Sequence, residues 1–94
     1  DRRLKDEIVP IPFALDKINQ IGGYSFVWNT QKQDIYNGKD YGVIAQEIEE
    51  ILPELVTTKE NGYKAVKYDK LVSLLIEGIK ELSSEIKELK EKNQ

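Results

Sequence analysis

Residues 68–94, YDKLVSLLIEGIKELSSEIKELKEKNQ, contain no proline and are predicted to form one long helix. Apolar residues recur along it at alternating intervals of three and four residues, which is the heptad pattern of a coiled coil. Valine and isoleucine fall at heptad position a and leucine at position d, and Asn93 ends the series at a. The predicted seam consists of Val72, Leu75, Ile79, Leu82, Ile86 and Leu89. We expect the side chain of Asp69 to cap the helix N-terminus.

Gly78 divides this helix into two parts. Before Gly78 the helix is also apolar at Leu71, Leu74 and Ile76, so that nearly its whole circumference is hydrophobic. A helix of this kind is buried on several sides. We therefore expect residues 69–78 to pack on the chain's own strands and on a partner.

After Gly78 the apolar stripe narrows to the heptad positions. The rest of the chain offers too few elements to cover it, so we expect residues 79–93 to self-associate. Glu85 at position g and Lys90 at position e have the spacing of an ion pair between parallel helices. Isoleucine at a with leucine at d favours a dimer, although the helix is short for this rule.

The residues before this helix, 1–67, predict a small α+β body. Pro10 and Pro12 exclude a helix through the first residues. We expect a helix within residues 12–21, strands over 24–28 and 41–45, a helix over 46–52 and a hairpin over 54–68 that turns at Asn61-Gly62. The first helix should bury Phe13, Ala14, Ile18 and Ile21 and end in a left-handed cap at Gly22-Gly23, and the second should bury Ile48, Ile51 and Leu52. The polar residues 29–40 suggest a loose hairpin that turns at Asn37-Gly38.

The composition limits the chemistry that is available to the chain. Its 94 residues make one domain and include no Cys, His or Met, so disulfides and Cys or His catalysis are impossible. The net charge of −3 draws the protein neither to nucleic acid nor to anionic lipid. No apolar run approaches the ~20 residues of a membrane span. We therefore expect no metal, no cofactor, no nucleic acid and no membrane among its partners.

Most candidate sites have a simpler structural explanation. Gly22-Gly23 is more typical of a helix stop than of a phosphate cradle, and none of the serines is predicted to lie near a base. Three aromatic residues that alternate along a strand favour core packing over base stacking, and three glutamates favour a solvent-exposed helix face. These residues are Tyr24, Phe26 and Trp28, and Glu47, Glu49 and Glu50.

The start of the chain concentrates positive charge. Arg2, Arg3 and Lys5 place three cations within four positions. Neighbouring cations and partial burial would favour loss of a proton from the Lys5 ammonium, and a neutral lysine is a competent general base for a serine hydroxyl. No serine lies in this segment, however. The charge pattern is therefore equally consistent with a charged arm that is simply exposed to solvent.

Several blocks of the sequence, taken in order, resemble one known family. They are DRRLKDEI at residues 1–8, ALDKINQI at 14–21, YSFVW at 24–28, YGVIAQEIEEILPELV at 41–56 and NGYKAVKYDKLVSLLIEGIKEL at 61–82. In these blocks the chain is similar to the intramolecular chaperone domain of the endosialidase type, the S74 peptidase family. The resemblance implies an autocleaving C-terminal domain of a phage tail spike, tail fibre or neck appendage.

This resemblance implies a Ser-Lys self-cleavage site at Asp1. The family motif is S-D-x-R-x-K, and Asp1, Arg3 and Lys5 match its last parts, whereas the serine would precede Asp1. Lys5 would be the general base, and Asp1 would supply the amide nitrogen that leaves. Arg3, with Arg2, would either depress the lysine pKa or orient the scissile peptide. We expect the chain to be the released product, or a chain made to begin at the same point, and therefore inactive by itself.

For three other features of the sequence, the resemblance leaves two alternative roles open. Gln46 and Glu47 either line the cleavage site or form a capped helix start. Residues 29–39 are either an arm that reaches along the client stalk or a floppy surface hairpin. Gly78 stands where the family's helix would carry alanine, and it allows either close helix approach at a threefold axis or a kink.

The resemblance implies a parallel homotrimer, so the expected fold is an α+β body with a long C-terminal helix in a trimeric coiled coil. Such a domain would direct the folding of the upstream β-rich stalk of its own precursor in the host cytoplasm, and it would be released from the mature virion fibre. Two alternatives remain. One is a trimerisation module without catalysis, and the other is the equivalent domain of a membrane-anchored transcription factor.

Overall fold

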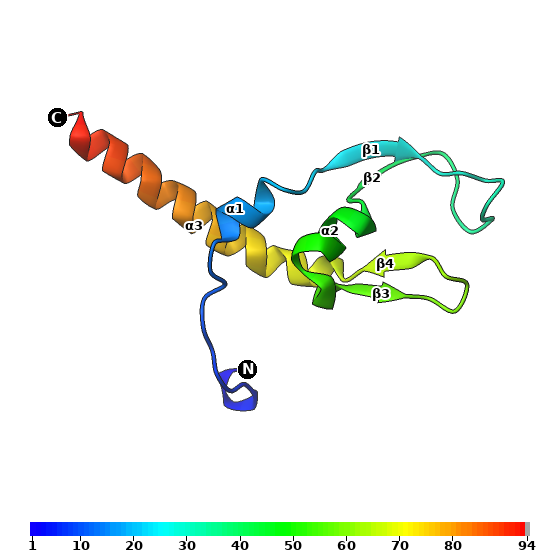
Figure 1. The fold of residues 1–94 in the computed structure, drawn as a ribbon, viewed down its shortest axis with the longest axis horizontal. Coiled ribbons are helices and arrows are strands. Elements are labelled where there is room, and N and C mark those ends of the chain that lie inside the picture. The colour runs from blue at the N-terminus through cyan, green and yellow to red at the C-terminus, as the bar shows by residue number, and fades with distance from the viewer. Residues whose placement is uncertain (94) are drawn as a thin grey trace.

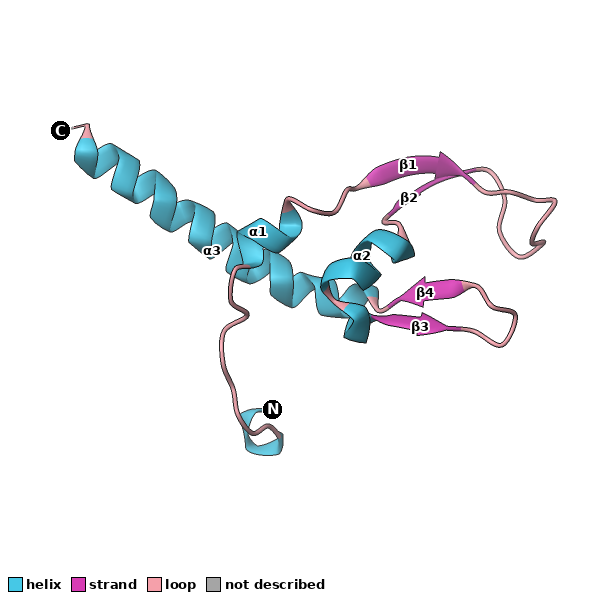
Figure 2. Ribbon diagram, in the orientation of Figure 1, coloured by secondary structure: helices cyan, strands magenta, loops and turns pink. Residues whose placement is uncertain are grey.

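The computed structural model describes residues 1–93 and places a long helix beside a small α+β body (Figure 1). The elements in chain order are the 3-10 helix η1 (Arg2–Leu4), helix α1 (Ala14–Ile18), strands β1 (Tyr24–Val27) and β2 (Lys39–Gly42), helix α2 (Ala45–Ile51), the 3-10 helix η2 (Pro53–Leu55), strands β3 (Val56–Thr58) and β4 (Lys64–Val66), and helix α3 (Tyr68–Lys92). β1 pairs with β2 and β3 with β4, both antiparallel, which makes two separate hairpins (Figure 2). The predicted α+β class is confirmed, with hairpins, short helices and a long C-terminal helix.

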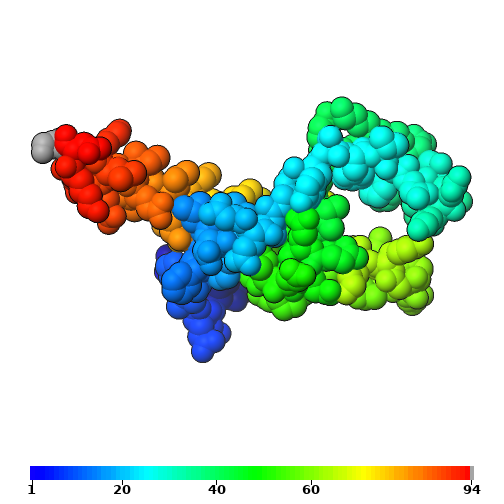
Figure 3. Space-filling model, turned by 45° about the horizontal axis from the view of Figure 1, so that its top comes forward, coloured from blue at the N-terminus to red at the C-terminus, as the bar shows by residue number. Residues whose placement is uncertain are grey.

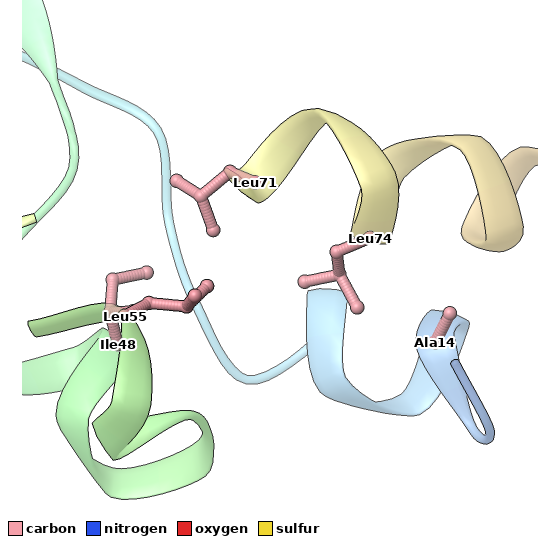
Figure 4. Packing of buried hydrophobic residues seen from close by; sticks show 5 residues of the cluster. All are labelled: Ala14, Ile48, Leu55, Leu71 and Leu74. Atoms are coloured by element: carbon pink, nitrogen blue, oxygen red, sulfur yellow. The ribbon is translucent and has the colours of Figure 1, made fainter. Parts of the chain in front are cut away.

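A small core lies where α3 meets α1, α2 and η2. Leu71 and Leu74 of α3 pack with Ala14, Ile48 and Leu55 (Figure 4). Partly buried side chains surround this cluster, namely Ile11, Ile18, Ile21, Val43, Leu52, Val56 and Val66. The first half of α3 therefore packs chiefly on helix α1 and not, as predicted, on the strands.

Helix α1 lies directly against α3 at Gly78. A Cβ at Gly78 would meet Cδ1 of Ile18, so the missing side chain allows the two helices to approach. Near this contact, the carboxylate of Glu81 accepts a hydrogen bond from the backbone nitrogen of Ala14 at 2.6 Å. This bond satisfies one of the N–H groups that the start of α1 leaves unpaired. The close approach at Gly78 is thus to α1 of the same chain, and α3 continues through it as one helix.

We expect Gly78→Leu to lower the free energy of unfolding by about 1–3 kcal/mol, because its side chain would overlap Ile18. Adding Ile18→Ala should recover part of the loss, since the shorter side chain vacates the contested space. Urea denaturation at one fixed protein concentration measures both effects. Equal losses from Gly78→Leu with and without Ile18→Ala would contradict the contact.

Helix α1 is shorter than the helix predicted within residues 12–21. Phe13 precedes it in a left-handed conformation (φ 52°), and its side chain is 74% exposed, so the prediction that it is buried is wrong. The chain leaves the helix after Ile18 in successive turns, and neither Gly22 nor Gly23 forms the predicted left-handed cap. Gly22 instead makes room for Tyr24, whose ring would overlap a Cβ at that position.

The first hairpin begins as predicted, but its second strand is shifted. β2 covers Lys39–Gly42 and not residues 41–45, because Val27 pairs with Lys39 and Tyr24 with Gly42. Gly38, at the end of the loop, has a φ of 75°, a conformation that glycine adopts at low cost.

The long connection of this hairpin is organised by one side chain. The amide nitrogen of Gln33 donates to the backbone oxygens of Asn29 and Tyr36 at 3.0 and 2.8 Å. Its amide oxygen accepts from the backbone nitrogens of Ile35 and Tyr36 at 3.2 and 2.9 Å. These four bonds give the polar connection a defined local conformation.

The second hairpin turns at Asn61-Gly62 as predicted, with Gly62 at φ 86°. The ammonium of Lys64 on β4 contacts both carboxylate oxygens of Glu49 on α2, at 2.6 and 2.7 Å. Glu49 therefore does not simply face solvent. At the start of α3 the cap position is Lys67, without a side-chain hydrogen bond, and Asp69 lies in the first turn. The predicted Asp69 cap is wrong, although its negative charge still favours this helix end.

The chain is extended for its size. Its solvent-accessible surface is 8031 Å², whereas about 5,500 Å² is typical of a compact monomer of this mass. Its radius of gyration is 17.3 Å, whereas about 12 Å is typical of this length. α3 and the two hairpins extend in opposite directions from the core (Figure 1). A single copy thus leaves roughly 2,500 Å² more surface in water than a compact domain of its mass would.

Candidate functional site

The apolar face of α3 is the most extensive exposed feature of the chain. α1, α2 and η2 cover Leu71 and Leu74 but leave the six predicted seam residues in solvent. Their exposed fractions are 55% for Val72, 47% for Leu75, 68% for Ile79, 44% for Leu82, 46% for Ile86 and 59% for Leu89. Ile76, predicted to be buried, is 53% exposed in the single chain. A contiguous apolar row of this kind is typical of an interaction surface.

The first residues of the chain form a tight turn. The carboxylate of Asp1 accepts a hydrogen bond from the backbone nitrogen of Arg3 at 2.9 Å and caps η1. The same carboxylate binds the Arg3 guanidinium, with 2.7 Å between Nη2 and Oδ2. Asp1 and Arg3 are therefore brought together as a pair.

Lys5 follows this turn in an extended conformation and is exposed. Within residues 1–93 its side chain makes no hydrogen bond or ion pair. Of the two alternatives for this charged segment, the single chain thus shows Lys5 as part of a solvated arm and not in a partly buried position. The segment that follows connects this turn to α1 without regular structure, so that the turn lies away from the body (Figure 1), and Leu4, Ile8 and Val9 are exposed.

Glu47 joins α2 to Gly22 and to the first residue of β1. Its carboxylate accepts hydrogen bonds from the backbone nitrogen of Gly22 at 3.0 Å and from the hydroxyl of Tyr24 at 2.7 Å. Gln46 beside it is exposed. Glu47 lies in the first turn of α2, where a negative charge is favourable. The helix begins after Ile44 without a side-chain cap, so the bonds of Glu47 tie α2 to Gly22 and Tyr24 and do not form the capped helix start that was one alternative for this pair. The prediction that Glu47 simply faces solvent is wrong.

The bond to Glu47 raises the pKa of Tyr24 above its ordinary value of 10.0, with smaller contributions from desolvation and from the negative charge of the carboxylate. Because the pKa is raised, the bond contributes fully to the free energy of unfolding below pH 10. This contribution disappears as the pH rises through the raised pKa of Tyr24. We expect Glu47→Gln to lower the ionisation pH of Tyr24, measured as tyrosinate absorbance against a Tyr24→Phe reference. Glu50→Gln, an exposed neighbour on α2, is the matched control, and equal titrations of the two variants would contradict the assignment.

The three alternating aromatic residues at β1, Tyr24, Phe26 and Trp28, lie outside the core. Trp28 stacks on Tyr36 with 4.7 Å between ring centroids and meets Phe26 edge-on at 4.9 Å. Tyr24 is 42% exposed, so the predicted core packing of these rings is wrong. The sequence reading missed Tyr36 and Tyr68, although Tyr68 lies seven residues before Leu75 and so continues heptad position d.

No helix within the part of the chain that the structure describes is long and apolar enough to cross a bilayer. Nor do residues 1–93 gather three or more carboxylates into a cluster that could hold a metal ion. The candidate functional elements are therefore the N-terminal turn with Lys5 and the apolar face of α3.

Comparison with known proteins gives one family and a consistent set of relatives. The family model Peptidase_S74, described as "Chaperone of endosialidase", matches residues 1–57. The chain is 33% identical over 98% of its length to the long tail fiber protein Gp37 of Enterobacteria phage K3, and likewise to that of Enterobacteria phage T2. It is 35% identical over 96% of its length to Gp37 of Salmonella phage S16.

The chain spans only a small part of these relatives, namely 8% of the K3 protein, 7% of the T2 protein and 13% of the S16 protein. The family match, in contrast, covers more than half of the chain and includes Asp1, Arg3, Lys5, Gln46 and Glu47. The chain therefore belongs to the Peptidase_S74 family, the chaperone of endosialidase.

Proposed function

We propose that this domain trimerises through α3 and directs the folding and assembly of an upstream phage tail fibre. The exposed heptad row of α3 carries this proposal, because the elements that the structure describes within residues 1–93 leave it in solvent. Three copies would bury the row in a parallel coiled coil and bring three precursor chains into register. Linking the chain ends in this way raises their effective concentration for non-local β pairing, which is slow when the chains are separate.

The fibre setting is favoured over the membrane-anchored transcription factor by the relatives, since those reported above are phage long tail fiber proteins. In that setting the domain acts in the host cytoplasm during assembly. Its partners are two further copies of itself and the β-rich stalk of its own precursor. Once it is removed, the mature fibre cannot easily refold and is held by its unfolding barrier.

Removal would occur by self-cleavage directly before Asp1. Lys5 would take the hydroxyl proton of a serine that precedes Asp1 in the precursor, and the serine oxygen would bond to the carbonyl carbon of the scissile peptide as its C–N bond breaks. The Lys5 ammonium would give its proton to the departing Asp1 nitrogen, which becomes the new amino terminus, and water would then hydrolyse the ester to a carboxylate. Arg3, held by the Asp1 carboxylate, would fix the turn next to the scissile bond. Support comes from the family match over this segment and from the spacing of Asp1, Arg3 and Lys5.

The exposure of Lys5 favours a second candidate, a trimerisation module without catalysis. Expression of the domain behind its native upstream sequence separates the two. A fragment that begins at Asp1, identified by mass spectrometry, together with a trimeric fibre supports the chaperone with cleavage. A trimeric fibre that keeps the domain supports the module, and a fibre that assembles equally well without the domain refutes both.

A further inference from the structure

The two hairpins enclose an open cleft at the N-terminal end of α3. Both project from this end, away from the C-terminus (Figure 1), and open space separates them in the space-filling view (Figure 3). The cleft has a volume of about 790 Å³, and its lining is mainly apolar and rich in aromatic side chains. Phe26, Trp28 and Tyr36 contribute from the first hairpin, Tyr63 from the second, and Tyr68 from α3.

The wall formed by the first hairpin is held in a fixed arrangement. Trp28 lies between Tyr36 and Phe26, and its indole nitrogen donates to the carboxylate of Asp40 at 3.0 Å. The Asp40 carboxylate also accepts from the backbone nitrogen of Tyr41 at 2.8 Å. A wall of rings packed on one another, with the indole nitrogen of Trp28 already paired, suits an apolar protein surface.

The opposite face of the same hairpin carries two exposed apolar side chains, Val27 and Tyr41, beside Ser25 and Lys39. In the β1–β2 register Val27 and Tyr41 alternate with the residues of the cleft wall, so they belong to the outer face, and Tyr41 also reaches the rim of the cleft. Val27 is 74% and Tyr41 72% exposed. A two-stranded hairpin is marginal by itself, and the described residues of this chain leave Val27 and Tyr41 in solvent.

The position of the cleft points to a second copy as its occupant. Tyr68, 53% exposed at heptad position d, lines the cleft and extends the apolar face of α3 into it by way of Val72. Parallel α3 helices would place the hairpins of neighbouring copies side by side at the same end. The roughly 2,500 Å² of surplus surface per chain is also on the scale of an obligate interface.

We propose that the cleft of one copy receives the outer face of the first hairpin, with Val27 and Tyr41, of a neighbouring copy. This inference rests on the proposed parallel trimer. The contact joins two different surfaces, and such head-to-tail contacts close into a ring under threefold symmetry. It also covers strand edges that two-stranded hairpins leave unpaired and open to aggregation.

Trp28 is the only tryptophan of the chain and reports on the cleft directly. The experiment measures acrylamide quenching of its fluorescence in the 94-residue chain, with the oligomeric state of each sample determined by sedimentation. We expect quenching to fall roughly twofold or more from monomer to trimer, because the core of an interface is shielded from water. In the trimer, Val27→Lys should restore monomer-like quenching, whereas Thr57→Lys, an exposed position of β3 outside the cleft, should not.

The outcomes separate this inference from the proposed function. A chain that stays monomeric at all concentrations refutes the trimer, and the inference falls with it. A trimer in which Trp28 is quenched as in the monomer refutes the inference and leaves the trimer intact. Shielding of Trp28 only when the upstream stalk is attached would identify the stalk as the occupant and likewise overturn the second copy.

Discussion

Lys5→Ala in a precursor that carries the native upstream sequence is expected to slow cleavage before Asp1 by about 10³-fold, within the range that general-base catalysis contributes. The physical reason is that the serine hydroxyl is a weak nucleophile unless a neighbouring base accepts its proton. Lys5→Arg should be equally inactive, because a guanidinium stays protonated and cannot act as a base. The measurement is the fraction of cleaved chain against time on a denaturing gel.

Lys87→Gln is the matched control for this prediction. It also removes one lysine ammonium, but at an exposed position of α3 outside the heptad row, and it leaves the pair formed by Asp1 and Arg3 intact. We expect it to cleave at close to the unsubstituted rate. Complete cleavage of the Lys5→Ala precursor at the normal rate would remove Lys5 from the mechanism, provided that sedimentation shows the same oligomeric state for both precursors.

Ile86→Lys and Leu82→Lys are expected to weaken self-association of the chain by about a hundredfold or more. Each places an ammonium group in the proposed seam, and an uncompensated buried charge costs about 3–5 kcal/mol. In a parallel trimer the three ammonium groups would also repel one another in one layer. Equilibrium sedimentation over a range of concentrations measures the effect.

Lys87→Glu is the control, because Lys87 is exposed beside Ile86 but lies outside the heptad row. It changes the charge of the helix and should leave association nearly unchanged, as expected for an exposed position. Equal weakening by Lys87→Glu and Ile86→Lys would mean that total charge, and not the seam, governs assembly. A strictly monomeric unsubstituted chain at tens of micromolar would refute the assembly proposal.

These two experiments are linked by the exposure of Lys5. In a single chain Lys5 is exposed and its side chain is unbonded within residues 1–93, so a base in a shielded site would have to be completed by assembly. On that proposal, Ile86→Lys should also slow cleavage of the precursor. Rapid cleavage by a monomeric precursor would contradict this link.

The sequence alone predicted the features that depend on residues close together in the chain. The heptad series predicted the long helix that the structure places at Tyr68–Lys92, and Asn61-Gly62 predicted the turn between β3 and β4. The spacing of Asp1, Arg3 and Lys5 pointed to the family that the comparison then established. In each case the signal lies within one element, where periodicity, turn conformation or a short motif acts without distant residues.

The tertiary structure decided which surfaces are covered and by what. The sequence cannot show that Gly78 makes room for Ile18, because the two residues come together only when α1 docks on α3. It equally could not show that Glu47 binds Tyr24 or that the rings of Phe26 and Trp28 line a cleft. Periodicity tells which residues share a face, whereas the partner of that face depends on contacts between segments far apart in the chain, and these exist only in the folded molecule.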